Sequence, residues 1–116
     1  MNLTGTNWIL TDTGSVVVEH EVGVFVRFDE EGGLSGYAGC NGFFGSYRLV
    51  DESIEIGPLG ATRKMCPNAI MDIEYTFMNA LQDARTFSIS GNKLELRDEQ
   101  GRAMTLTGSS NTQEQE

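Results

Sequence analysis

Four glycines at every third position mark residues 36–47, whose sequence is GYAGCNGFFGSY. A helix is unfavourable for them, because each internal glycine costs about 0.5–1 kcal/mol relative to alanine. A regular strand repeats its faces every two residues, so a spacing of three does not match a strand either. Such a stretch is typical of strand edges, bulges and a turn at which two backbones approach closely. We therefore expect a strand, a tight bend and a second strand here, with aromatic side chains filling the space beside the glycines.

The acidic composition argues against several classes of partner. The chain has 116 residues, with 17 acidic and 8 basic side chains and a formal net charge of −9. Binding to nucleic acid or to an anionic membrane depends on Lys and Arg, so we expect neither. No apolar run approaches the roughly 20 residues of a membrane helix, and the segment MNLTGTNWIL lacks the basic and apolar regions of a signal peptide. The length predicts one domain, which we expect to be a monomer.

Apolar residues that alternate with polar ones predict short strands through most of the chain. Besides the two strands of the glycine-rich stretch, the predicted strands include residues 6–10, 16–18, 22–28, 54–56, 86–90, 93–97 and 104–106. Turn signals rich in Gly, Asn and Asp separate them, which favours antiparallel connections.

One segment changes to a helical period. From Pro67 to Ala84 the apolar residues are spaced by three and four, which predicts an amphipathic helix. The apolar stripe consists of Ile70, Ile73, Phe77, Leu81 and Ala84. We expect the polar residues Asp72, Glu74, Asn79 and Asp83 to fall mostly away from this stripe.

These elements predict a mainly β fold of the α+β type. We expect about eight strands in a small curved antiparallel sheet or cracked barrel, with the helix packed across an open end or face. The predicted domain covers residues 3–107. Residues 108–116 contain no apolar side chain and are predicted to form a mobile tail.

Few residues of the chain could carry catalysis or hold a cofactor. His20 lies between Glu19 and Glu21, but on a strand it points to the opposite face from both, and a zinc site would lack its usual ligands. The glycine spacing does not match phosphate-binding loops. A Cys–His dyad has no local motif to place it. We therefore expect no enzyme, no metal and no cofactor.

Cys40 and Cys66 are the two chemically reactive side chains. In an oxidising compartment they could form a disulfide, and closing a loop of about 25 residues would contribute roughly 3 kcal/mol in the chain-entropy model. Two alternatives are buried free thiols and a redox-active pair, although the Cys-x-x-Cys spacing of redox enzymes is missing. We interpret the pair as structural.

The aromatic residues of the glycine-rich stretch allow two interpretations. Phe43, Phe44 and Tyr47 could line a surface for an apolar ligand or a partner, or they could pack in the core. Core packing is the simpler expectation. Asn41 is expected to support a turn through its side chain.

With these motifs in place, the chain resembles the META domain, the family of the bacterial heat-shock protein HslJ, from Leu3 to Leu106. The opening strand of the family is matched by residues 5–8, and an acid-bearing helix and a Gly-x-x-Leu-x-Leu strand are matched by residues 74–81 and 91–96. Two more specific signatures are matched by Gly39, Cys40, Asn41, Phe43, Gly45 and Tyr47, and then by Thr62, Arg63, Met65 and Cys66.

The resemblance implies a compact β-rich domain of the bacterial envelope, linked with heat and antibiotic stress. We accordingly expect a periplasmic or outer-membrane-associated protein, with the cytoplasm as the alternative. The leading hypothesis is a non-enzymatic stress-response domain that binds an envelope or secretion-related protein or another envelope component. The second hypothesis is a carrier of a lipid or small apolar ligand, similar in shape to lipoproteins that help to assemble secretion pores. The third is a thiol-redox protein.

Overall fold

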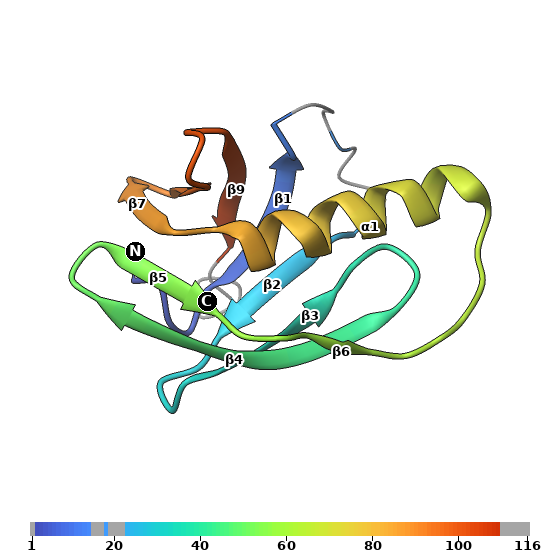
Figure 1. Ribbon diagram of the computed structural model, residues 1–116, viewed down its shortest axis with the longest axis horizontal. Coiled ribbons are helices and arrows are strands. Elements are labelled where there is room, and N and C mark those ends of the chain that lie inside the picture. Colours follow the sequence, from blue (N-terminus) through green and yellow to red (C-terminus); the bar gives the residue numbers. More distant parts are fainter. Residues whose placement is uncertain (1, 15–17, 19–22, 110–116) are drawn as a thin grey trace, which may run out of the picture.

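The computed structural model describes residues 2–14, 18 and 23–109 (Figure 1). Within these ranges the chain forms nine strands and one helix. The elements are β1 (Asn7–Asp12), β2 (Phe25–Phe28), β3 (Gly33–Tyr37), β4 (Gly42–Val50), β5 (Ser53–Ile56), β6 (Gly60–Ala61), α1 (Asn68–Asp83), β7 (Thr86–Ser90), β8 (Lys93–Arg97) and β9 (Ala103–Ser109).

The strands form one antiparallel sheet that curves round into a ring. Their order is β3-β2-β1-β9-β8-β7-β5-β4-β6, and an additional pairing between β3 and β4 closes the ring. The long strand β4 makes this closure possible, because β5 pairs with its second half while β6 pairs with Phe43 and Phe44 in its first half. The predicted β-rich fold with a curved antiparallel sheet and one helix is confirmed.

The ring is weakest between β5 and β7. Only Ser53 and Thr86 are in register there, and two backbone hydrogen bonds flank them, from Ile54 to Arg85 and from Phe87 to Glu52. The helix α1 lies across the curved sheet (Figure 1) and contacts β5. The ring is therefore an uneven barrel, in which β5 and β7 are joined over only a short stretch.

Side chains from the inner face of the sheet fill the core together with the helix. The largest fully buried side chains are Trp8, Leu10, Val24, Val26, Phe28, Ile54, Phe77, Leu81, Leu94, Leu96, Met104 and Leu106. The indole N–H of Trp8 donates to the carbonyl of Leu3 at 2.9 Å, so the one polar atom of that side chain is satisfied.

The helix confirms the predicted apolar stripe but differs from the prediction on its polar side. It begins at Asn68, directly after Pro67, and buries Phe77 and Leu81. The expectation for Glu74 was wrong, because this carboxylate is buried with them. Asp72 and Asp83 are exposed as expected.

Three other differences concern strand boundaries. Strand β6, one of the nine strands of the described residues, was not predicted. Strand β2 is shorter than the predicted residues 22–28, although the carbonyl of Val24 still accepts a hydrogen bond from Leu10. Strand β9 continues to Ser109, two residues into the predicted tail. Most of the predicted strand of residues 16–18 and most of the predicted tail lie outside the described residues, because these exclude residues 16, 17, 19–22 and 110–116. Within the described ranges no helix is long and apolar enough to span a membrane.

Candidate functional site

The bend between β3 and β4 presents backbone N–H groups to the helix. Ala38 donates its backbone N–H to the carbonyl of Asn41 at 2.9 Å, which closes the bend. Gly39 has φ +120°, a conformation that residues with a Cβ rarely adopt. Gly36 is also restricted, because a Cβ there would lie 2.1 Å from the carbonyl oxygen of Phe25. The glycines of this stretch therefore permit the turn and the close approach of two strands.

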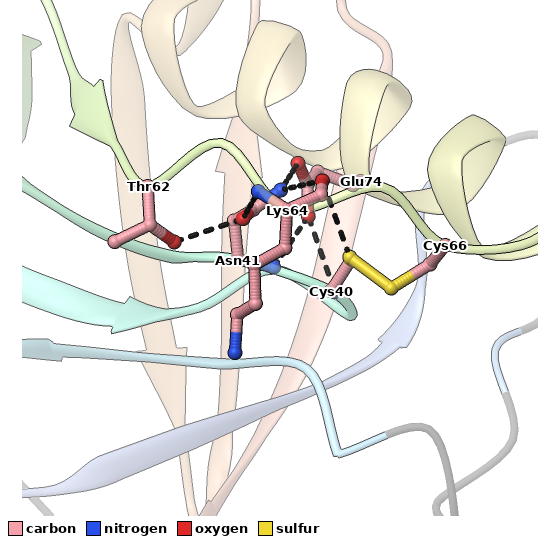
Figure 2. Close-up of a disulfide and its surroundings, with 6 residues drawn as sticks. All are labelled: Cys40, Asn41, Thr62, Lys64, Cys66 and Glu74. Atoms are coloured by element: carbon pink, nitrogen blue, oxygen red, sulfur yellow. Dashed lines mark hydrogen bonds between the residues drawn. A yellow bond between two sulfur atoms is a disulfide. The ribbon is translucent and has the colours of Figure 1, made fainter.

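The carboxylate of Glu74 binds the backbone of this bend at Cys40 and Asn41 (Figure 2). Its Oε1 accepts the backbone N–H groups of Cys40 and Asn41 at 3.1 and 2.8 Å, and its Oε2 accepts Asn41 Nδ2 at 2.8 Å. Glu74 is 8% exposed, and no cation pairs with it among the described residues. Three N–H donors thus compensate for the burial of one negative charge.

The side chain of Asn41 connects the bend to the segment before the helix. Its Oδ1 accepts the Thr62 hydroxyl at 2.8 Å and the Lys64 backbone N–H at 2.7 Å, and its Nδ2 also donates to the Lys64 carbonyl at 3.1 Å. The two donors and two acceptor positions of the amide are therefore all used. Rather than supporting a local turn, this side chain bonds a segment more than 20 residues away.

A disulfide completes the connection. Cys40 and Cys66 are bonded, with their Cα atoms 6.0 Å apart and a sequence separation of 26. Cys40 is only 1% exposed. We refer to Cys40, Asn41, Cys66 and Glu74 together as the clasp. It joins the β3–β4 bend, the segment 62–66 and the helix in one small buried cluster.

Directly beside the clasp the chain exposes an unusual combination of side chains. Met65 is 85% exposed and Phe44 is 63% exposed. Arg63 and Lys64 are exposed as well, and neither forms an ion pair within the described part of the chain. We call these four residues the ledge. Figure 2 shows the Lys64 amine on the side away from the disulfide.

The cations of the ledge differ from most others in the protein. Arg48, Arg85, Arg97 and Arg102 each bind a neighbouring carboxylate. The ledge instead borders an open groove of about 540 Å³, which Leu59 and Met71 also line. Unpaired positive charge and exposed apolar surface therefore meet at one place on an acidic protein.

The three aromatic residues predicted as a possible ligand surface do not lie together. Phe43 is 3% exposed and meets Phe77 edge to face, with ring centroids 5.7 Å apart. Tyr47 is half-buried, with its ring 4.9 Å from that of Phe28. Of the three, only Phe44 belongs to the ledge.

Tyr47 is held by its hydroxyl, which donates to the backbone carbonyl of Asp29. Burial raises the pKa of this hydroxyl above 10.0, and the nearby carboxylates of Asp29 and Glu30 raise it further. Gly45, another residue of the predicted motif, lies in β4 opposite Leu34. Tyr47 and Gly45 therefore contribute to contacts between chain segments of the sheet, and neither is part of the ledge.

Sequence reasoning missed Glu74, which bonds two of the predicted motif residues. Glu74 lies four positions after Ile70 and three before Phe77, so the helical period places it beside the apolar stripe. This position beside the apolar stripe was the sequence signal that Glu74 is buried. Glu19, His20 and Glu21, which were predicted not to form a metal site, lie outside the described residues. Elsewhere in the described chain, no group of three His, Cys, Asp or Glu side chains could hold a metal ion.

Comparisons with known proteins agree with this architecture. The family model of the META domain matches residues 1–111. A protein from Burkholderia xenovorans solved by NMR is similar, with 26% identity, a TM-score of 0.76 and coverage of 92% of this chain and 83% of the other.

Two further structures show the fold alone. A second NMR structure has 21% identity and a TM-score of 0.72, with 90% of each chain covered. A crystal structure of a DUF4847 family protein from Bacteroides vulgatus has 13% identity and a TM-score of 0.68, with 90% of this chain and 93% of the other covered. A search of curated proteins gives no significant match.

Proposed function

Because this chain belongs to the META domain family, we propose that it is a non-enzymatic, envelope-associated stress-response domain that binds a protein through the ledge. The observation that carries this proposal is the ledge itself. Met65 and Phe44 expose apolar surface beside two unpaired cations, Arg63 and Lys64. Exposed apolar groups gathered at one place are typical of surfaces that bind a partner.

The clasp supports this proposal by fixing the position of the ledge. Asn41 bonds both polar backbone groups of Lys64, and the disulfide holds the chain at Cys66. Binding to a surface that is already ordered costs less conformational entropy than binding to a mobile loop. The disulfide is also compatible with an oxidising compartment outside the cytoplasm.

The buried core favours an external surface over an internal ligand. The interior between the strands contains Trp8, Phe28 and Phe77, all fully buried. A lipid carried inside the ring would have to displace such side chains. The burial of Cys40 likewise favours a structural disulfide over redox chemistry, because reactive cysteines are at least partly exposed.

Site-specific photocrosslinking in living cells of the native host tests the proposal. A photoreactive amino acid replaces Met65 in one variant and Lys93 in a matched control, because Lys93 is exposed on β8 and also lacks an ion pair in the described structure. We expect one crosslinked protein of defined mass from position 65, and its loss when Phe44→Ser is added. Equal products from both positions, or none from position 65, would contradict the proposal.

A further inference from the structure

Residues 63–65 of the ledge directly follow strand β6, whose outer edge has no strand partner among the described residues, and this arrangement indicates how a partner binds. We propose that the partner contributes an extended acidic segment, which adds a strand to the outer edge of residues 61–65. This inference rests on the proposed function. An added strand gains affinity from backbone hydrogen bonds, while its side chains give specificity.

Strand pairing shows which backbone groups face outward. Strand β6 ends the strand order, so within the described chain its outer edge has no strand partner. Thr62 donates its backbone N–H to Gly42 on β4 at 3.1 Å. Backbone groups in an antiparallel pair alternate between the two edges. Those of Ala61 and Arg63 therefore face away from β4.

The same alternation continues past the end of β6. The amide of Asn41 bonds the N–H and the carbonyl of Lys64, as a neighbouring strand would. The backbone groups of Arg63 and Met65 have no hydrogen-bond partner among the described residues. The edge thus offers backbone donors and acceptors at alternate positions, as a strand-addition site requires.

Side chains around this edge define the chemistry of the segment. Arg63 and Lys64 would each be able to bind a carboxylate, because neither is paired within the described structure. The adjoining groove, which Phe44, Leu59 and Met71 line, can accept an apolar side chain. Successive side chains of an extended segment lie on opposite faces, so a chain that alternates acidic and apolar residues offers carboxylates to one of these two cations and apolar side chains on its other face.

Charge also disfavours two other occupants. A second copy that paired through the same edge would bring Arg63 and Lys64 close to the same cations, and like charges facing one another across a strand pair are destabilising. The net charge of −9 would oppose the approach of an extended anionic surface such as a membrane. A short acidic segment is affected mainly by charges within the Debye length of about 8 Å. The structure therefore favours a peptide over a bilayer.

The test uses the full chain with its disulfide intact and labelled with ¹⁵N. The probe is a short acetylated peptide in which valine alternates with glutamate, and amide chemical shifts report its binding. We expect saturable shifts concentrated in residues 61–65. Lys64→Glu should weaken binding about tenfold, and Lys93→Glu, with the same change in net charge, should alter it less than about twofold.

Two further probes separate strand addition from other modes of binding. The same peptide with N-methyl groups on alternate residues cannot form one row of backbone hydrogen bonds, so we expect its binding to be lost. A peptide with lysine in place of glutamate should not bind. The inference is wrong if the glutamate peptide does not bind, if the methylated or the lysine peptide binds equally well, or if the shifts lie elsewhere.

Vesicles of phosphatidylglycerol test the alternative that the ledge binds an anionic membrane. Binding of the ledge to these vesicles in place of the peptide would overturn the inference in favour of a membrane contact. The crosslinking experiment is independent of both probes. A specific protein crosslink at position 65 without peptide binding would refute strand addition alone, whereas loss of the crosslink would refute the proposed function.

Discussion

Replacing Glu74 is expected to destabilise the protein more than replacing any exposed acid on the same helix. Its carboxylate is the acceptor for the backbone N–H groups of Cys40 and Asn41 and for the side-chain amide of Asn41. Glu74→Ala leaves these three donors without their acceptor in a buried place. Each such donor costs about 1–3 kcal/mol, and release of a buried charge offsets part of the total. We expect a net loss of about 3 kcal/mol in the free energy of unfolding.

Glu74→Gln separates the effect of charge from the effect of shape. The amide oxygen of glutamine can still accept two backbone N–H groups, but its NH₂ group would face Asn41 Nδ2, which is also a donor. We expect this variant to lose about 1–2 kcal/mol, less than the alanine variant. Asp72→Asn is the matched control, because Asp72 is exposed on the same helix, and it should change stability by less than about 0.5 kcal/mol.

Urea unfolding followed by tryptophan fluorescence measures these changes. The chain has one tryptophan, and Trp8 is fully buried, so its emission reports unfolding of the core. The disulfide stays oxidised throughout, and the dependence of stability on urea should be similar in all variants. If Glu74→Ala unfolds within 0.5 kcal/mol of the unaltered protein, the structural role assigned to this carboxylate is wrong.

Two further predictions concern the disulfide and Tyr47. Thiol counting under denaturing, non-reducing conditions should find no free thiol, and reduction of Cys40–Cys66 should lower stability by roughly 3 kcal/mol; two titratable thiols in the purified protein would contradict the disulfide. Folding raises the pKa of the Tyr47 hydroxyl, so the unfolded chain loses this proton at a lower pH than the folded protein does. The contribution of Tyr47 to the free energy of unfolding is therefore complete below pH 10.0 and declines as the pH rises through the folded-state pKa. The difference in tyrosinate absorbance between the unaltered protein and Tyr47→Phe should have its midpoint above pH 10.0, and a midpoint below it would refute the assigned burial.

The main features of the fold could be predicted because they depend on local periodicity. Alternating apolar residues indicated the strand of residues 93–97, and spacing by three and four indicated the helix with Phe77 and Leu81 on its buried face. Strand β6 could not be found in this way, because its two residues, Gly60 and Ala61, are too few to show a period. Its existence depends on pairing with β4, which is a long-range contact.

The candidate site was predictable only in part. Cys40 and Cys66 could be paired as one of several alternatives, since their residue type restricts their chemistry. The role of Glu74 depends on the backbone N–H groups of a bend more than 30 positions away, and no local pattern encodes that contact. The exposure of Phe44 beside the buried Phe43 follows from strand alternation, but the proximity of Met65 depends on the clasp.

The most direct test of the central claim is the yield of photocrosslinking at position 65 relative to position 93, measured with and without the disulfide. If the clasp holds a protein-binding ledge in place, position 65 should give a specific crosslink in the native protein and a much lower yield in Cys40→Ala/Cys66→Ala. Circular dichroism and Trp8 fluorescence verify that this double variant remains folded. Equal yields at positions 65 and 93 in the native protein, or an unchanged yield at position 65 without the disulfide, would contradict the claim.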